Sequence, residues 1–459
     1  MNPSYPLALH IFRRDLRLQD NTALIAALTA SACVIPCFIF DKRQIEHNDY
    51  KSDNSIQFMI TSLRELDAEL KQKQSKLYFF YGIAEDVVKQ LIETLPIQAV
   101  FANRDYTPFS KMRDHKIEDI CRRHKIDFHI YADALLNEPE DVHKENKEPY
   151  TVFTPFFRKA STLHVKPVQK KSFDHYYRKK IAFEDKKTLI RLSQLHNPNL
   201  FVKGGRLEAL SLLTKIKKLS DYEKTRNIPA FSGTTKLSAH NKFGTLSIRE
   251  VYAAIVKAFG NQHTLITELY WRDFFTHIAF HFPHVFDGPF HKKYAGLTWS
   301  NNQQHYRAWC EGRTGFPIVD AGMRELNISG FMHNRVRMIV ASFLVKDLHI
   351  DWCWGEKYFA QKLIDYDPAV NNGNWQWAAS TGCDAQPYFR IFNPWLQQKT
   401  YDPECLYIKR FVPELARLSV KAIHALNTTS LPSFTNYPSL LIDHSIESQK
   451  TKRMYKKFL

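Results

Sequence analysis

The fold of this chain is decided near its amino terminus by the run Leu7-Ala8-Leu9-His10-Ile11-Phe12. Its length and its apolar residues are typical of a buried strand. Asp20 follows, and its type and position predict the cap of a helix that begins near Asn21. A buried strand that leads into a helix is the first repeat of an α/β fold.

The alternation of strand and helix continues to about residue 131. Apolar runs predict further strands at 33–40, 76–81, 99–103 and 128–131, and helical spacing predicts helices at 55–70, 86–95 and 111–124. We therefore expect an α/β domain with a mostly parallel, doubly wound sheet. Because no Gly-x-Gly-x-x-Gly turn follows the first strand, the sequence does not indicate dinucleotide binding there.

The pattern changes after the sheet. Residues from about 138 to 199 are polar, basic and interrupted by proline, which is typical of a long connection. Beyond Gly204 the spacing is helical, as in Val336, Ile339, Val340, Phe343 and Leu344. The predicted organisation is an α/β domain at 1–133, a connection at 134–199 and a larger all-helical domain at 200–459.

The charge of the chain indicates a polyanionic partner. Among 459 residues, 64 are Lys or Arg and 47 are Asp or Glu, which gives a formal charge of +17. Cationic side chains that neutralise phosphates release counterions, so such a surplus favours nucleic acid binding. The surplus gathers at 170–171, 178–180 and 186–187 and in the tail at 450–457. A solvated surface is the alternative interpretation of these runs.

Cysteine usage and hydropathy exclude several classes. The seven cysteines form no Cys-x-x-Cys pair, so we expect neither a disulfide framework nor a metal site. The first apolar run is too short for a signal peptide, and no later run could span a bilayer. We expect a cytoplasmic protein with no membrane partner.

Tryptophan is concentrated in the second half of the chain, where seven of the eight lie between Trp271 and Trp377. Packing in the core is the usual role of this residue, but here polar runs accompany it, above all the segment from Asn371 to Trp377. Consecutive asparagines disfavour a helix interior and prefer turns or ligand contacts. Exposed aromatic faces could also stack on unpaired bases.

Three polar groups are candidate ligand contacts, each with a structural alternative. The charged residues Asp365, Asp367, Arg335 and Arg337 form salt bridges or border a cofactor ring. The segment 234–238, Thr-Thr-Lys-Leu-Ser, binds phosphates or caps a helix. Glu268, Trp271 and Arg272 share one helix face, where Glu268 and Arg272 could simply form a surface ion pair.

Taken together and in order, these stretches resemble the DNA photolyase/cryptochrome family over nearly the whole chain. The strongest matches are 331–338 (Phe-Met-His-Asn-Arg-Val-Arg-Met), 371–380 and 384–394; the stretches 268–272 and 314–321 and the opening 12–17 (Phe-Arg-Arg-Asp-Leu-Arg), followed by Asp20 and Asn21, also match. The resemblance is closest to the class I-type enzymes that split cyclobutane pyrimidine dimers.

The resemblance implies an amino-terminal antenna domain and a helical domain that holds FAD in a folded conformation. The phosphates and ribityl chain would be contacted by Tyr222, Thr234, Thr235, Lys236, Leu237, Ser238 and Arg272. The flavin would be surrounded by Asn334, Arg337, Asp365 and Asp367, with Asn371 facing its N5 atom. Asparagine at this last position accompanies repair in the family, whereas plant cryptochromes carry aspartate and animal ones cysteine.

The resemblance also implies a reaction. Light-excited reduced flavin would donate an electron to a flipped-out dimer, which would be held between Trp271 and Trp377, contacted by Met338 and hydrogen-bonded by Glu268. Trp375, Trp352 and Trp299 would pass electrons to oxidised flavin, while Trp309 and Trp354 would only pack in the core. Six-four photolyases place two histidines at the lesion. The sequence from His333 to Met338 here fits the dimer-splitting branch better.

The antenna chromophore stays open. Folate-binding members present a glutamate after the fourth strand, and residues 103–110 offer no such carboxylate. A folate antenna is therefore not favoured; a deazaflavin, another flavin or no antenna are the alternatives.

The partner that this interpretation predicts is UV-damaged DNA. It implies no protein partner, and we expect a monomer. Two other functions remain as alternatives: a cryptochrome-like photoreceptor that binds FAD but only signals, and a flavin-free nucleic-acid-binding module whose aromatic residues stack on bases.

Overall fold

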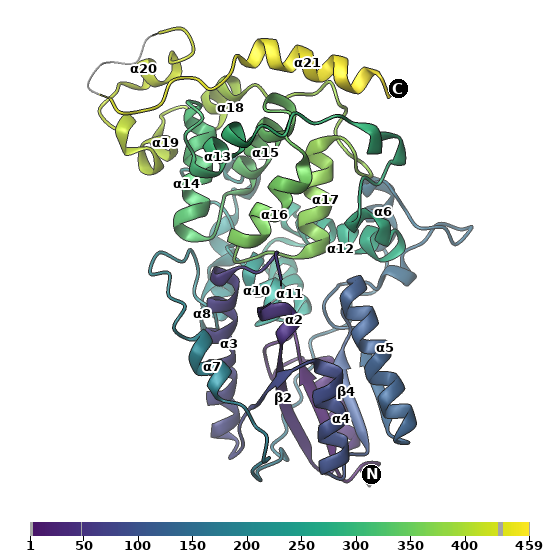
Figure 1. Ribbon diagram of the computed structural model, residues 1–459. Coiled ribbons are helices and arrows are strands. Elements are labelled where there is room, and N and C mark those ends of the chain that lie inside the picture. Colours follow the sequence, from purple (N-terminus) through teal and green to yellow (C-terminus); the bar gives the residue numbers. More distant parts are fainter. Residues whose placement is uncertain (1–2, 47, 430–434, 459) are drawn as a thin grey trace. The chain divides into compact units, whose positions relative to one another are not determined.

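A five-stranded parallel sheet forms the amino-terminal part of the computed structural model, which describes residues 3–46, 48–429 and 435–458 (Figure 1). The strands are β1 (Ala8–Phe12), β2 (Val34–Asp41), β3 (Tyr78–Gly82), β4 (Ala99–Asn103) and β5 (Asp127–Tyr131). Their order in the sheet is β3-β2-β1-β4-β5, and every neighbouring pair is parallel. The predicted doubly wound α/β fold is confirmed, with strand bounds that differ by one or two residues.

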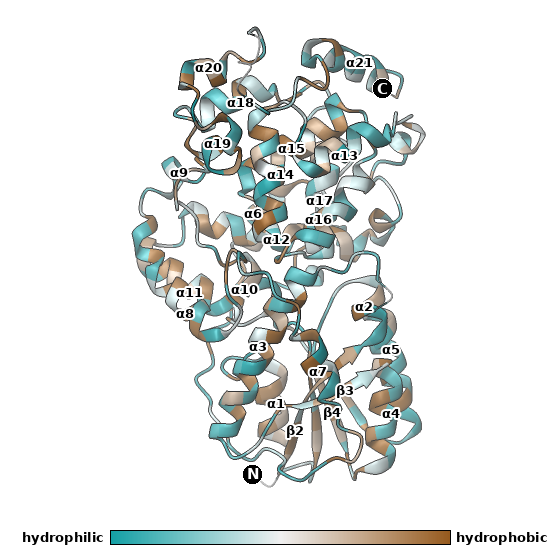
Figure 2. Ribbon diagram, turned by 60° about the vertical axis from the view of Figure 1, so that its left-hand side comes forward, coloured by the Kyte–Doolittle hydropathy of each residue, from teal (hydrophilic) through white to brown (hydrophobic). Residues whose placement is uncertain are grey.

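Helices cover both faces of this sheet. The connecting helices are α1 (Thr22–Ala30), α2 (Lys42–Ile45), α3 (Asp53–Gln72), α4 (Ala84–Thr94) and α5 (Pro108–Arg123). Figure 2 shows α1 and α3 on one side of the strands and α4 and α5 on the other. In α4 the residues Val87, Val88 and Leu91 are buried, because spacings of one, three and four residues turn them to the same face.

The cap of the first helix differs from the prediction. Asn21, not Asp20, is the capping residue of α1, and its side chain accepts a hydrogen bond from the backbone N–H of Leu24. Asp20 has a positive φ of 48° and is fully buried. Its carboxylate instead accepts a hydrogen bond from Arg249 Nε at 2.9 Å. Asp20 therefore pairs with a residue that is distant in sequence, which local sequence patterns do not reveal.

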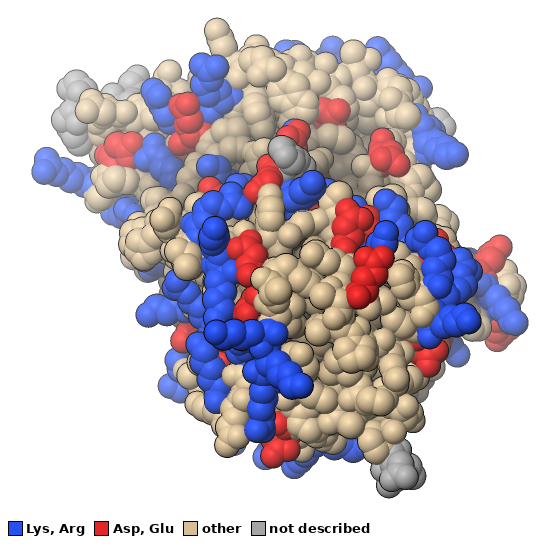
Figure 3. Space-filling view, turned by 60° about the horizontal axis from the view of Figure 1, so that its bottom comes forward, with Lys and Arg blue, Asp and Glu red and all other residues tan. Residues whose placement is uncertain are grey.

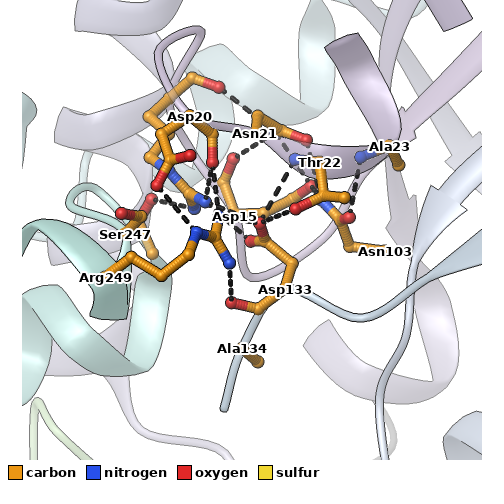
Figure 4. A network of polar contacts seen from close by, with 12 residues as sticks. Asp15, Asp20, Asn21, Thr22, Ala23, Asn103, Asp133, Ala134, Ser247 and Arg249 are labelled. Carbon is orange, nitrogen blue, oxygen red and sulfur yellow. Dashed lines mark hydrogen bonds and ion pairs between the residues drawn. The ribbon is translucent and has the colours of Figure 1, made fainter. Parts of the chain in front are cut away.

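A buried polar network surrounds this turn (Figure 4). Arg17 donates two hydrogen bonds to the carboxylate of Asp133, at 2.8 and 2.7 Å, and Arg249 donates a third at 2.8 Å. Burial alone would raise the pKa of Asp133, but Arg17 and Arg249 outweigh it and lower that pKa to about 2. The network ties the loop after β1 to the end of the sheet and to α11 (Ile248–Phe259).

The connection after the sheet contains helices that the broken pattern concealed. Within 134–199 lie α6 (Phe153–Ala160) and α7 (Lys187–Leu192). The irregular part between them pairs with the sheet, since the N–H of Tyr177 donates to the carbonyl oxygen of Val34. The connection is therefore packed along much of its length.

The chain divides by its internal contacts into two compact units. Unit 1 comprises Met1–Asn197, Val202–Lys218 and Thr235–Pro283, and unit 2 comprises Pro198–Phe201, Leu219–Thr234 and His284–Leu459. Unit 1 thus includes α8 (Arg206–Thr214), α10 (Ser238–Phe243), α11 and α12 (Thr264–His281). These four helices lie beyond residue 199, where the helical domain was predicted to begin. The units defined by internal contacts therefore differ from the domains predicted from composition. The predicted division into domains stays a prediction.

Unit 2 is helical. Its helices are α9 (Tyr222–Thr225), α13 (Gln303–Glu311), α14 (Pro317–Ser329), α15 (Asn334–Ser342), α16 (Trp352–Lys362), α17 (Pro368–Ala379), α18 (Pro394–Tyr401), α19 (Leu406–Phe411), α20 (Val420–His424) and α21 (His444–Lys456). The predicted apolar face of 336–344 is buried in their common core and continues past α15 into a π-helical turn, Phe343–Asp347. The predicted all-helical second part is confirmed.

Candidate active site

A cavity in unit 2 brings together several of the predicted ligand-binding residues. It encloses about 660 Å³ of space, part of it open to solvent, and lies against α15, the end of α16 and α17. Its lining includes eight predicted site residues: Asn334, Arg337, Met338, Asp365, Asp367, Asn371, Trp375 and Trp377. Apolar and aromatic side chains with a few convergent polar groups are the usual lining of a ligand pocket.

An ion pair crosses one wall of this cavity. Arg337 donates a hydrogen bond from Nη2 to Asp365 Oδ2 at 2.9 Å and another from Nε to the carbonyl oxygen of Met332 at 2.7 Å. The Asp365 side chain is only 4% exposed. Its other oxygen, Oδ1, is buried without a hydrogen-bond partner among the described residues. A buried carboxylate oxygen that lacks a donor fits a ligand that carries an N–H or O–H group.

Asn371 is held in a fixed orientation at the cavity. Its amide nitrogen donates two hydrogen bonds to Glu356, one to the backbone oxygen and one to Oε1, both at 3.0 Å. Because both donors are engaged there, the amide oxygen is left as an acceptor for a ligand. Glu356 lies on α16, 15 residues before Asn371, and no local sequence pattern marks it as a site residue.

The asparagine-rich run, predicted to form a turn or to contact a ligand, lies inside a helix. Residues 371–377 all belong to α17, which Pro368 opens and Asp367 caps through hydrogen bonds from the N–H groups of Ala369 and Val370. Asn372 and Gln376 both donate to the carbonyl oxygen of Val285, at 3.0 Å. Because these amides satisfy the polar backbone of a neighbouring segment, tertiary contacts outweigh their weak helix propensity.

His333 caps the helix that carries four of the residues lining the cavity. Its Nδ1 accepts a hydrogen bond from the N–H of Arg335 at the start of α15. Burial, assisted by Arg337 and Arg335, lowers the pKa of His333 to about 4. The ring is therefore neutral at pH 7. Nδ1 must be unprotonated to accept the hydrogen bond from Arg335.

The predicted electron-carrying tryptophans share one core. Trp375 and Trp352 are 2% and 4% exposed, and Trp299 is half-buried against the same cluster. Gly355 permits the contact of Trp375 with α16, because a Cβ at Gly355 would come within 2.2 Å of that ring. Trp309, predicted only to pack, meets Trp375 edge to face with ring centroids 6.2 Å apart.

The predicted contacts on α12 lie in unit 1. Glu268, Trp271 and Arg272 all lie on α12, as predicted. Arg272 donates a hydrogen bond to the carbonyl oxygen of Ala134 at 2.7 Å and also pairs with Asp273. The ring of Trp271 lies parallel to that of Phe153, with centroids 3.6 Å apart.

The hydroxyl-rich segment spans the point where the two units divide, since Thr234 belongs to unit 2 and Thr235 to unit 1. Thr235 Oγ1 accepts a hydrogen bond from the N–H of Leu237, Lys236 has a positive φ of 58°, and Ser238 begins α10. The turn therefore resembles a helix entry. Tyr222 begins α9 in unit 2, with the Arg226 guanidinium 5.4 Å from its ring centre. The phosphate contacts of these residues stay a prediction.

Basic side chains gather in groups on one face of the molecule (Figure 3). The connection contributes exposed cations to the basic surface. Among the described residues, seven of these cations make no ion pair: Lys166, Lys170, Lys171, Arg178, Lys179, Lys180 and Lys187. In the tail, Lys450 pairs with Glu447. A surface with so many uncompensated cations suits a polyanion.

Within the described parts of the chain, no three His, Cys, Asp or Glu side chains are grouped so that they could hold a metal ion. The same residues include no helix with the length and apolar character needed to cross a bilayer.

The fold and the cavity define a class of protein in which a parallel α/β sheet is joined to a helical unit with a polar, tryptophan-lined ligand site. Two family models match the chain, one for DNA photolyase over residues 8–172 and one for the FAD binding domain of DNA photolyase over residues 265–457. The chain belongs to the DNA photolyase family.

Relatives resemble the chain along its whole length. A deoxyribodipyrimidine photo-lyase of Vibrio cholerae is 37% identical over 97% of this chain and 98% of its own. An archaeal photolyase of Sulfolobus tokodaii, solved with two FAD molecules, is 42% identical with a TM-score of 0.89, and the match covers 98% of this chain and all of the other. A cryptochrome of Synechocystis is 27% identical with a TM-score of 0.87, over 99% of this chain and 100% of its own.

Proposed function

We propose that this protein is a deoxyribodipyrimidine photolyase that uses FAD and light to repair cyclobutane pyrimidine dimers in DNA. The observation that carries the proposal is Asn371, a cavity residue whose amide nitrogen is anchored on Glu356 and whose amide oxygen is left as an acceptor. Family membership over nearly the whole chain supports the same activity.

The residues of the cavity fit FAD. When it is bound, reduced and excited by light, FAD supplies the electron that opens the cyclobutane ring. Asp365 Oδ1 would accept a hydrogen bond from the flavin ring, and the Arg337 cation would hold the Asp365 carboxylate in place. The amide oxygen of Asn371 would accept a hydrogen bond from an N–H group of the ring. Asn334 and Asp367 would complete the polar surround.

The lesion would be held by aromatic and polar side chains. Trp377 and Met338 line the flavin cavity, and Trp271 with Glu268 would contact the flipped-out pyrimidines from α12. Stacking on tryptophan binds a base regardless of its sequence, and a preorganised carboxyl group can hydrogen-bond the carbonyl or N–H edge of a pyrimidine. The uncompensated cations of the connection would contact phosphates along the strand.

The finer assignments belong to the same proposal. We infer a class I-type enzyme that works as a monomer in the cytoplasm, with an antenna domain at 1–133 and the flavin and repair domain at 200–459. The antenna domain would hold either a chromophore other than folate or none. The relative of Sulfolobus tokodaii, solved with two FAD molecules, makes a second flavin one candidate.

A repair assay tests the proposed function. FAD-loaded, reduced protein is incubated with dimer-containing single- and double-stranded oligonucleotides, in blue light and in darkness. The expected result is monomer formation only in the light, and an absorbance spectrum of the same sample identifies the chromophores. Absence of light-dependent monomer formation by flavin-loaded protein would reject the proposal.

Replacing Glu268 with alanine is expected to lower the repair yield while FAD stays bound. Loss of one hydrogen bond to the lesion, worth about 0.5–1.5 kcal/mol, corresponds to roughly a twofold to tenfold decrease. Glu268→Gln keeps a hydrogen-bonding side chain, so its repair yield should lie between those of wild type and Glu268→Ala. An unchanged yield in Glu268→Ala would remove this residue from the reaction.

Trp299→Phe is expected to slow the reduction of oxidised FAD by blue light but to spare repair by protein that is already reduced. Removal of one carrier should slow reduction by about tenfold or more, equivalent to about 1.4 kcal/mol in the barrier. Trp354→Phe, on the neighbouring helix α16, is the control and should reduce normally. If Trp299→Phe also reduces normally, electrons reach Trp375 by another route, for which Trp309 is a candidate because its ring contacts that of Trp375.

A photoreceptor is the second candidate, favoured by the similarity to the Synechocystis cryptochrome. It predicts a light-driven change in the flavin redox state with no loss of dimers from any DNA substrate. The repair assay, run with the absorbance spectrum, separates the two.

A further inference from the structure

Helix α6, from the connection, supplies a ring that covers one face of Trp271. α6 and α12 lie side by side in unit 1 (Figures 1 and 2). The rings of Phe153 and Trp271 have centroids 3.6 Å apart and planes inclined by only 7°. Two parallel rings at this separation are in direct face-to-face contact, so no ligand can enter between them.

Phe153 is itself held in place from other sides. It is 6% exposed, and its ring stacks with Phe157 of its own helix at 5.8 Å and meets Phe274 of α12 edge to face at 5.7 Å. Phe156, from the same turn of α6, packs against Phe274 at 5.2 Å. A ring confined in this way has little rotamer freedom left to lose.

Trp271 is only partly open to a ligand. Its side chain is half-buried; on α12 the ring of Phe275 lies 5.6 Å away with planes inclined by 29°, and Phe274 meets the indole edge to face at 5.7 Å. Since Phe153 occupies one face of the indole, the exposed part of Trp271 must belong to its opposite face or its rim. A base that stacks on Trp271 would do so there.

We propose that Phe153 is a positioning residue for the lesion: it holds the indole of Trp271 in place, so that the exposed part of the indole is already ordered when the flipped-out pyrimidine binds. This proposal rests on the proposed function. A tryptophan fixed before binding spares the complex the entropy cost of ordering that side chain. The effect should therefore fall on the affinity for damaged DNA, whereas the chemistry in the bound complex stays the same.

The test uses the full FAD-loaded chain with Phe153→Leu, which removes the parallel ring but keeps most of the buried volume. The dissociation constant for a dimer-containing single-stranded oligonucleotide is expected to rise about threefold to tenfold, which is the equivalent of one newly mobile side chain. Affinity for undamaged DNA, flavin absorbance and repair at saturating substrate should all match wild type. Equal affinity of wild type and variant for the dimer would overturn the proposal.

A matched control and a double-mutant cycle separate positioning from general stability. Phe157→Leu removes a ring of the same helix that contacts Phe153 and Tyr270, so lesion affinity should stay as in wild type. In a Trp271→Ala background, Phe153→Leu should have no further effect on lesion affinity, because its effect acts through the indole. Additive losses, or an equal loss in Phe157→Leu, would mean that Phe153 only packs. Failure of the wild type to repair dimers would instead reject the proposed function.

Discussion

Protein in which Arg337 is replaced by alanine is expected to fold but to purify without the colour of bound flavin. The substitution leaves Asp365 buried without its cation, and Oδ1 of that residue already lacks a partner among the described residues. Loss of one member of a buried, hydrogen-bonded charge pair at a binding site costs about 2–5 kcal/mol, or at least roughly a 30-fold weaker affinity for FAD. The ratio of flavin to protein absorbance after gentle purification measures the effect.

Arg335→Ala is the matched control for this variant. Arg335 lies on the same helix, two residues earlier, but its guanidinium contacts the amide oxygen of Asn227 at 2.9 Å and the ring of Tyr401 at 4.3 Å. It does not belong to the lining of the cavity. Flavin content should therefore stay near that of wild type, and equal loss in both variants would show that α15 as a whole, not the Arg337–Asp365 pair, retains the cofactor.

Asp133→Ala is expected to be the most destabilising single change in the sheet-containing unit. Asp133 is 3% exposed and accepts hydrogen bonds from both Arg17 and Arg249, which are themselves buried. Without it two guanidinium groups stay buried with fewer acceptors, which costs about 3–5 kcal/mol. Chemical denaturation followed by circular dichroism measures the loss. Asp119→Ala, which removes an exposed ion pair with Arg122, should cost less than about 1 kcal/mol.

The carboxylate of Asp133 should also make the free energy of unfolding depend on pH. Because its pKa is lowered to about 2 in the folded protein, against about 3.9 in an unfolded chain, its contribution is complete above roughly pH 5. It is lost as the pH falls towards 2, since the unfolded chain binds the proton first. The difference in unfolding free energy between wild type and Asp133→Asn should therefore narrow between pH 5 and pH 3. A constant difference over this range would contradict the assignment of the shift to Asp133.

Local pattern was sufficient for the five strands of the sheet and for the helical character of the second part of the chain. Apolar runs marked all five strands, and helical spacing marked the buried face of α15, because the side-chain periods of strand and helix are properties of the local backbone. The resemblance to a family named the residues that line one cavity of unit 2, although their roles towards flavin and lesion stay predictions.

Tertiary structure decided which partner each polar or aromatic group takes. Asp20 was expected to cap a helix but pairs with Arg249. The asparagines, expected in a turn or at a ligand, lie inside α17, where Asn372 donates a hydrogen bond to the backbone of Val285. Phe153 could not be connected with Trp271 from the sequence, since 118 residues separate them along the chain. The physical reason is the same in each case. Secondary structure follows from interactions between near neighbours in sequence, whereas hydrogen-bond and stacking partners are fixed only when distant segments pack together.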